Sequence, residues 1–227
     1  MDTDLQPADN VTAIAERLAL AILEHRLAPG TKMSEDDVGE IFGVSRTIVR
    51  AAFQRLSHDR LIDLRRNRGA FVAQPTVREA LEVFEARALL EPRMARSAAE
   101  RATRADIAFL RDHIGQEHAA IHARDFGRAL YLSGQFHVEL VRIADQDTIA
   151  SFIRQLVSRS SLVIALYWQR RHALCESDAH HTLIDAMARG DGALAEKVMT
   201  AHLADLLASL DLRRRTSGTM SLKDALS

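Results

Sequence analysis

Three histidines in the C-terminal part of the sequence have a spacing that suits metal-ion binding. His180 and His202 are 22 residues apart, and Gly190-Asp191-Gly192 lies midway between them. If two antiparallel helices flank that turn, both imidazoles lie at the same height, about 15 Å from it. His137 lies in another apolar-rich stretch, YLSGQFHVELVRIA. Three converging imidazoles suit zinc, nickel, copper or iron, whereas each histidine alone also fits a hydrogen-bonded core or surface residue.

A cluster of arginines in the N-terminal part could bind a polyanion. Residues 44–70 contain seven arginines and two aspartates, an excess of five positive charges in a chain whose formal net charge is −1. The candidate contacts are Ser45, Arg46, Thr47 and Arg50 at the start of a predicted helix, and Arg68 and Gly69 in a predicted hairpin turn. Backbone N–H groups, hydroxyls and guanidinium groups are the donors that phosphates and guanine edges require. The pattern indicates DNA binding, with a solvated basic helix face as the alternative.

Residues 1–74 predict three helices followed by a hairpin. Apolar residues recur at helical spacing in VTAIAERLALAILEHRL, and Pro29-Gly30 ends this helix. Ser34 is the predicted N-cap of a short second helix that ends at Gly43, and Ser45 is the predicted N-cap of the third, RTIVRAAFQRL. The runs LIDLRR and AFVAQ predict two strands joined by a turn at residues 67–69. This order predicts a winged helix-turn-helix, whose second helix enters the major groove.

Residues 75–227 predict an all-helical bundle. Ala, Leu, Glu and Arg dominate there with a helical period. Breaks near residues 102–103, 123–125, 145–147, 172–177 and 190–192 predict about six helices. The apolar periodicity is lost after Arg213, so we expect the tail to fray. The predicted fold class is mainly α, with a winged helix-turn-helix followed by a bundle.

Composition excludes several other classes of protein. The 227 residues are 47% hydrophobic and 27% charged, which is typical of a folded globular chain. No run approaches 18 uncharged apolar residues, and the acidic start MDTDLQPADN differs from a secretory signal. The single cysteine excludes an internal disulfide and a cysteine-rich zinc module. We therefore expect a cytoplasmic protein that is not associated with membranes.

The segment PGTKMSEDDVGEIFGVSRTIVRAAFQRLSHDRLIDLRRNRGAFVA resembles the winged-helix domain of the GntR family of bacterial transcription regulators. The resemblance covers nearly all of residues 10–74. It implies that Arg46, Thr47 and Arg50 contact the operator and that the turn at Arg68 and Gly69 forms the wing contact. Departures such as Ile48, where proline is common, and Ala51, where glutamate is common, remove no DNA-facing donor.

Residues 76–212 resemble the FCD-type helical effector domain that follows this winged helix in one GntR subfamily. The matching stretches are VFEARALLEPRMA, QFHVEL and SDAHHTLIDAMARGDGALAEKVMTAHL. The resemblance places His137, His180 and His202 on the metal-ligand positions of that domain. The fourth ligand of the family is an aspartate, and Ser133 stands in its place. A hydroxyl is a weak ligand, so a water or an effector carboxylate is the alternative for completing the shell.

Arg87 resembles the buried arginine of the same domain, which binds a carboxylate effector. A helical ion pair with Glu91, four residues later, is a second interpretation that is compatible with the first.

Taken together, the patterns and the resemblance predict a ligand-responsive transcriptional regulator. We expect a homodimer, more often a repressor in this family, that binds a palindromic double-stranded operator and responds to a small organic or sugar acid. One alternative is a metal-dependent enzyme built on the three histidines, but no general base and no HExxH pattern accompany them. The other is a DNA-binding dimer that responds to no effector.

Overall fold

The computed structural model of the chain describes residues 7–66, 68–168, 178–213 and 222–226. The described residues form two compact units that meet in the sequence between Gln74 and Pro75. The short C-terminal helix belongs to the first unit, although the sequence groups residues 75–227 together. Each unit has its own buried apolar core.

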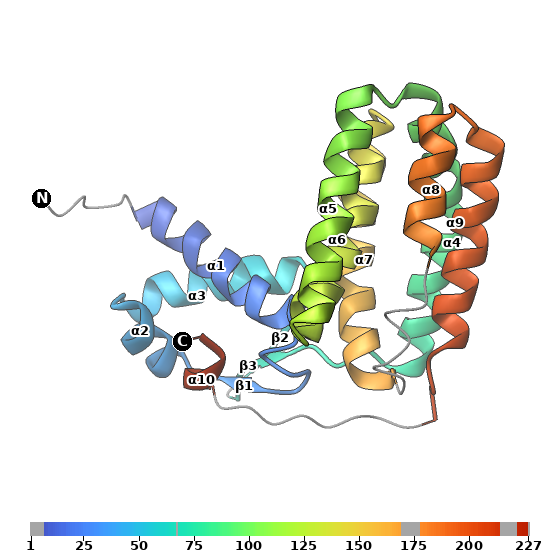
Figure 1. Cartoon of the computed structure of the whole chain (residues 1–227). Helices are drawn as coiled ribbons and strands as arrows, with labels where there is room; N and C mark the ends of the chain where they lie inside the picture. The colour runs from blue at the N-terminus through green and yellow to red at the C-terminus, as the bar shows by residue number, and fades with distance from the viewer. Residues whose placement is uncertain (1–6, 67, 169–177, 214–221, 227) are drawn as a thin grey trace, which may run out of the picture. The chain divides into compact units, whose positions relative to one another are not determined.

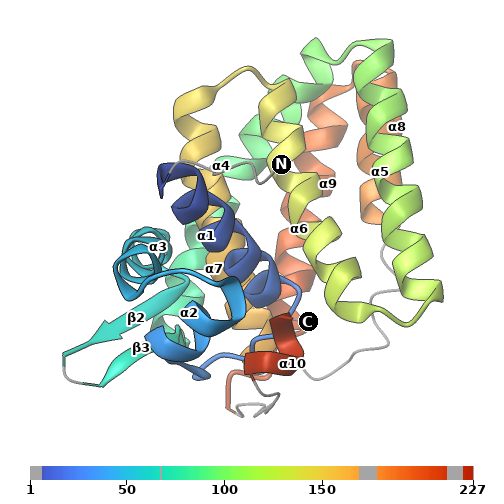
Figure 2. The same cartoon turned by 90° about the vertical axis from the view of Figure 1, so that its left-hand side faces the viewer.

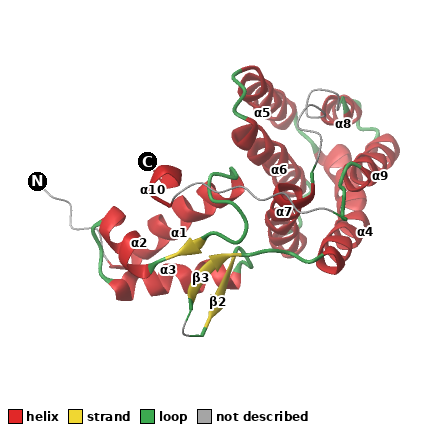
Figure 3. Ribbon diagram, turned by 90° about the horizontal axis from the view of Figure 1, so that it is seen from below, coloured by secondary structure: helices red, strands yellow, loops and turns green. Residues whose placement is uncertain are grey.

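The first unit combines helices with a small antiparallel sheet (Figures 1 and 3). Its elements are α1 (Pro7–Leu23), β1 (Lys32–Met33), α2 (Glu35–Phe42), α3 (Arg46–His58), β2 (Ile62–Arg65), β3 (Gly69–Val72) and α10 (Leu222–Leu226). The strand order is β1-β3-β2, so β3 pairs with both neighbours. Leu18 and Ile22 of α1 and Phe53 and Leu56 of α3 are buried in its core. The predicted three helices and hairpin are confirmed, while Asn67 of the predicted turn lies outside the described residues.

The turn between α2 and α3 is built by the residues that the sequence singles out. Ser34 Oγ accepts hydrogen bonds from the backbone N–H groups of Asp36 and Asp37, which satisfies two donors of the first turn of α2. Gly43 ends α2 with φ +64°, a left-handed conformation that glycine adopts without strain. Ser45 is the N-cap of α3, but its side chain makes no capping hydrogen bond.

The second unit is a bundle of helices in the described residues (Figures 1 and 2). They are α4 (Val77–Arg101), α5 (Arg104–His122), α6 (Phe126–Ile143), α7 (Asp147–Tyr167), α8 (Ala179–Ala188) and α9 (Gly192–Ala208). Thr76 with Glu79 and Thr103 with Asp106 form capping boxes that begin α4 and α5. The six predicted helices are confirmed, and the predicted break at residues 172–177 lies outside the described residues.

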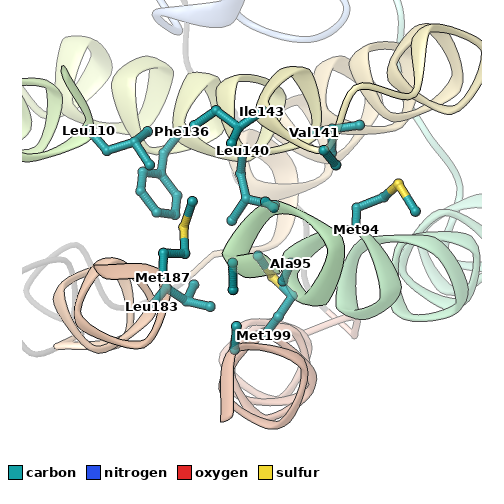
Figure 4. Close-up of a cluster of buried hydrophobic side chains, with 14 of the residues drawn as sticks. Met94, Ala95, Leu110, Phe136, Leu140, Val141, Ile143, Leu183, Met187 and Met199 are labelled. Carbon is teal, nitrogen blue, oxygen red and sulfur yellow. The ribbon is translucent and has the colours of Figure 1, made fainter. Parts of the chain in front are cut away.

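The apolar faces of the bundle helices meet in one large core (Figure 4). Ala95 of α4, Leu140 of α6, Leu183 of α8 and Met199 of α9 are all completely buried there. The helix α7 is long and apolar enough to cross a membrane by length and composition alone. In its apolar window 33% of the residues are buried, and buried residues of α7 such as Ile153 pack in the bundle.

The short helix α10 packs against α1 and α2. Ala225 and Leu226 are buried, and the guanidinium groups of Arg26 and Arg17 donate to the backbone carbonyls of Ala225 and Leu226 respectively. Our expectation that the tail frays is therefore wrong for residues 222–226. Two apolar side chains and two hydrogen-bonded carbonyls hold this helix, although it is too short to show periodicity.

Candidate DNA-binding surface and three-histidine site

Three helices of the bundle bring the predicted histidines together. His137 lies on α6, His180 on α8 and His202 on α9. Their ring centroids are 5.0 to 5.5 Å apart, and one nitrogen of each ring lies within 4.8 Å of the others. The Phe136 ring stacks on His180 with centroids 4.2 Å apart and closes one side of the cluster. The convergence predicted from the Gly190-Asp191-Gly192 turn is present.

Buried carboxylates lie behind two of the histidines. Glu91 Oε2 is 2.6 Å from His137 Nδ1, and Glu117 Oε2 is 3.3 Å from His180 Nδ1. Because an ionised carboxylate only accepts, each Nδ1 carries the proton and each Nε2 has a lone pair. His180 Nε2 and His202 Nε2 are buried and have no hydrogen-bond partner among the described residues. Buried nitrogens of this kind fit a bound divalent metal ion.

Burial keeps the imidazoles of His137 and His202 neutral by lowering their pKa values. It lowers the pKa of His137 to about 4, against the opposing charge of Glu91. Burial, with the neighbouring His180 and His137, also lowers the pKa of His202 well below its usual value. Neutral imidazoles have the lone pairs that a metal ion requires, so the site is poised to bind metal at neutral pH.

Arg87 and Glu91 form a buried ion pair on α4, as the second interpretation of Arg87 predicted. Arg87 Nε donates to Glu91 Oε1 at 2.5 Å, Nη2 donates to Oε2 at 3.3 Å, and Nη1 donates to Ser160 Oγ at 2.9 Å. Burial alone would raise the pKa of Glu91, but the charges of Arg87 and His137 and their hydrogen bonds outweigh it and lower that pKa to about 2. Glu91 therefore joins Arg87 to the histidine cluster through His137.

Some residues of the site differ from the sequence interpretation. Glu117 on α5 was missed, because no sequence spacing relates it to a histidine 63 positions later. His113 on α5, which the sequence interpretation does not include, is buried, and its Nε2 lies 2.8 Å from the carbonyl oxygen of Leu132. The packing of α5 on α6 supplies this partner. Ser133 is half-buried on α6, one turn before His137.

The first turn of α3 exposes the predicted DNA-contacting residues. Ser45, Arg46, Thr47 and Arg50 are exposed, while Val49 on the same helix is buried. Arg50 Nε donates to both carboxylate oxygens of Glu35, at 2.9 and 2.8 Å, and the Arg46 Nε lies 2.5 Å from Asp36 Oδ1. The hydrogen bond and charge of Glu35 raise the pKa of Arg50 above its usual value.

The β2–β3 hairpin forms the wing beside α3. Arg68 and Gly69 are exposed at its tip, and Gly69 has φ +93°, which favours glycine. A cleft of about 590 Å³ lies between α3 and the hairpin, and Arg50, Arg65 and Arg66 are among the residues that line it. Exposed arginines thus lie on both the predicted recognition helix and the wing, and Glu35 and Leu64 also line the cleft between them.

Comparison with known proteins agrees with both units. The sequence-family model for bacterial regulatory proteins of the gntR family matches residues 10–72. The sequence-family model for the FCD domain matches residues 82–205. The chain is 29% identical to the HTH-type transcriptional repressor RspR of Escherichia coli K12, over 97% of this chain and 98% of that protein. It is 27% identical to the galactonate operon transcriptional repressor of the same organism, over 82% and 90% of the two chains.

A solved structure shows the same arrangement of elements. The chain superposes on a putative GntR transcriptional regulator from Rhodococcus sp. RHA1 with a TM-score of 0.77 and 25% identity, covering 87% of this chain and 95% of that one. The two family models that match this chain describe DNA-binding regulators and not enzymes, which excludes the alternative of a metal-dependent enzyme. The chain belongs to the GntR family of bacterial transcription regulators, with an N-terminal helix-turn-helix domain and a C-terminal FCD domain.

Proposed function

We propose that the protein is a cytoplasmic homodimeric repressor that binds a palindromic operator and responds to a small organic or sugar acid. Residues 1–74 are the proposed DNA-binding domain, and the region from residue 75 onward binds the effector and dimerises. A dimer with one winged helix per half-site matches the symmetry of a palindrome. The names of the relatives, which include a galactonate operon repressor, support a sugar acid as effector. The observation that carries the effector-binding part of the proposal is the buried histidine cluster, in which two nitrogens have no partner among the described residues.

His137, His180 and His202 would hold a divalent ion such as zinc or nickel through Nε2. When bound, the ion supplies a positive centre for carboxylate and hydroxyl oxygens of the effector. Ser133 contributes no carboxylate, so the protein offers one anionic ligand fewer than the family pattern. An acid that chelates through two oxygens is therefore the effector class that the site favours.

In this proposal, binding of an effector to Arg87 depends on whether Glu91 is displaced. Glu91 accepts from Nε and Nη2 of Arg87 and Ser160 accepts from Nη1, so an effector carboxylate that paired with the Nε–Nη2 edge would have to displace Glu91. That exchange would also remove the partner of His137 Nδ1. Because α4 begins three residues after Gln74, a rearrangement at Arg87 would act on the helix that leads directly to the DNA-binding unit. The effector must favour one arrangement of the DNA-binding units to change operator affinity.

The experiment that tests this proposal is metal analysis of protein purified without an affinity tag. Mass spectrometry should find about one zinc or nickel ion per chain, and His137→Ala should lose it. The exposed histidine variant His118→Ala is the control and should keep the ion. Thermal shifts with sugar acids should then depend on the metal. Absence of the ion after addition of Zn²⁺ or Ni²⁺ would contradict the metal site, and acid responses that are identical in His137→Ala would contradict its role.

The DNA-binding part of the proposal is tested separately. Arg50→Ala should abolish operator binding in gel-shift titrations, while light scattering still shows a dimer. Unchanged operator affinity would refute the role of Arg50. If the operator affinity of the wild-type protein does not change when metals or acids are added, the result would instead support a DNA-binding dimer that responds to no effector.

A further inference from the structure

The two arginines at the start of α3 are both held by acidic residues at the start of α2. Glu35 receives two hydrogen bonds from Arg50, and Asp36 forms an ion pair with Arg46. The capping of α2 by Ser34 fixes the position of both acids, because it orders the turn in which they lie. Elsewhere in the basic segment, Arg65 of the wing lies 3.7 Å from Asp63, a longer ion pair, and Arg68 makes none among the described residues.

Both acids approach their arginine from the same side of the guanidinium group. Each closest contact is made through Nε, and the terminal nitrogens of Arg50 make no hydrogen bond within the described chain. The side chains of Arg50 and Arg46 remain 63% and 66% exposed. The terminal N–H groups of each arginine are thus available to solvent, and they are the groups that pair with O6 and N7 of guanine.

This arrangement has two physical consequences. An arginine that is already held in one orientation loses less side-chain entropy when it binds a base edge. The carboxylate beside it offsets its charge and repels phosphates, which weakens binding that depends on the DNA backbone alone. An exposed ion pair adds little to folding stability, so stabilisation of the fold is a weak explanation for the two pairs.

We propose that Glu35 and Asp36 are positioning residues that set sequence specificity by orienting Arg50 and Arg46 toward guanine edges while lowering affinity for non-specific DNA. The pair with Glu35 is the stronger element of this device, because the Glu35 side chain is 30% exposed whereas that of Asp36 is 62% exposed, so water screens the Glu35 pair less. Specificity depends on the difference between the affinity for the operator and the affinity for non-specific DNA. Both acids change both of these affinities.

The test compares three variants that each lose one negative charge from the first turn of α2. Glu35→Gln and Asp36→Asn remove the positioning acids, and Asp37→Asn is the matched control, since the exposed Asp37 makes no ion pair among the described residues. Each full-length protein is used to select duplexes from a randomised DNA library. Affinity for the duplex selected by wild type, and for a random-sequence duplex, is then measured over a salt series.

Asp37→Asn should strengthen binding to both duplexes similarly. Glu35→Gln should strengthen binding to the random duplex but weaken binding to the selected one, so that the ratio of the two affinities falls about tenfold. Its selected sequences should also lose a guanine preference in each half-site. Asp36→Asn should show the same signs with a smaller change. Thermal unfolding of the three variants should agree, because they lose the same charge at the same helix end.

Two results would overturn the proposal. One is a ratio of selected-duplex to random-duplex affinity that is the same in Glu35→Gln and Asp36→Asn as in Asp37→Asn. This would show that Glu35 and Asp36 act only through their negative charge. The other is the same fall in the ratio when Glu35→Gln is made in an Arg50→Lys background, which keeps the positive charge but lacks the guanidinium group that Glu35 holds, and this would show that Glu35 does not act through Arg50.

Discussion

At the scale of single residues, the histidine cluster depends on a buried charge network. Arg87 is 2% exposed and Glu91 is completely buried, so neither charge is stabilised by water. Glu91 offsets the charge of Arg87 and accepts a hydrogen bond from the protonated Nδ1 of His137. One carboxylate thus stabilises the fold of α4 and the orientation of the His137 ring.

We expect Glu91→Gln to lower the free energy of unfolding by about 3–5 kcal/mol, because it leaves the Arg87 charge buried without a counter-charge. The double variant Arg87→Met with Glu91→Leu should recover most of this loss, since it removes both charges. Denaturant unfolding measures both. The control is Arg78→Ala, which removes an exposed ion pair with Glu82 and should leave the unfolding midpoint unchanged. Equal unfolding midpoints for Glu91→Gln and wild type would disprove this account.

The pKa of His137 predicts how stability depends on pH in metal-free protein. The folded value is about 4, whereas an unfolded histidine has a value of about 6.5. Between these values the unfolded chain binds a proton that the folded chain does not, so stability is retained above about pH 6.5 and decreases as the pH falls toward 4. His137 alone contributes a slope of up to about 1.4 kcal/mol per pH unit, and His202, whose pKa is also lowered, adds to it. Urea unfolding in the presence of a chelator measures it, and a His137→Gln variant with the wild-type slope would contradict the assignment.

The sequence predicts the three clustered histidines better than it predicts their surroundings. The positions of His137, His180 and His202 follow from helical spacing and one turn, which are local properties. The carboxylate of Glu117 reaches His180 only because α5 and α8 pack together. Such neighbours depend on tertiary packing, for which a single sequence carries no local signal.

At the scale of elements, capping and periodicity account for the helices that the sequence predicts. The breaks near residues 102–103 and 190–192 coincide with the N-caps Thr103 and Asp191. The strand β1 was not predicted, because two residues cannot show alternation and its position depends on pairing with β3. The helix α10 was missed for the same reason, as its contacts are with residues about 200 positions earlier.

The two serine N-caps of the helix-turn-helix should respond differently to substitution. Ser34→Ala removes two capping hydrogen bonds of α2 and should lower the free energy of unfolding by about 1 kcal/mol. Ser45 makes no capping hydrogen bond, so Ser45→Ala should leave stability nearly unchanged but weaken DNA binding. Thermal unfolding and gel-shift titration separate the two effects. Equal destabilisation by both substitutions would contradict this assignment of the caps.

At the scale of the whole molecule, the DNA-binding unit is connected to the bundle at both ends of the bundle's sequence. It leads into α4, which carries Arg87 and Glu91, and it includes α10, which follows α9 and its His202 in the chain. Two helices that contribute to the histidine and arginine site are therefore the ones covalently nearest to the DNA-binding unit. In the proposed function, this connectivity would give ligand binding two covalent routes to the DNA-binding unit.

The contribution of the C-terminal route can be measured by removing α10. Deletion of residues 222–227 exposes the surface of α1 and α2 that Ala225 and Leu226 cover, and it should destabilise the DNA-binding unit by about 1–2 kcal/mol. Calorimetry should show this as a lower transition temperature for that unit, with the bundle transition unchanged. Lys223→Ala, an exposed substitution on the same helix, is the control. If α10 also transmits the signal from α9, the deletion should reduce the effect of added metal on operator affinity, whereas an unaltered metal response would leave α4 as the route that couples the two units.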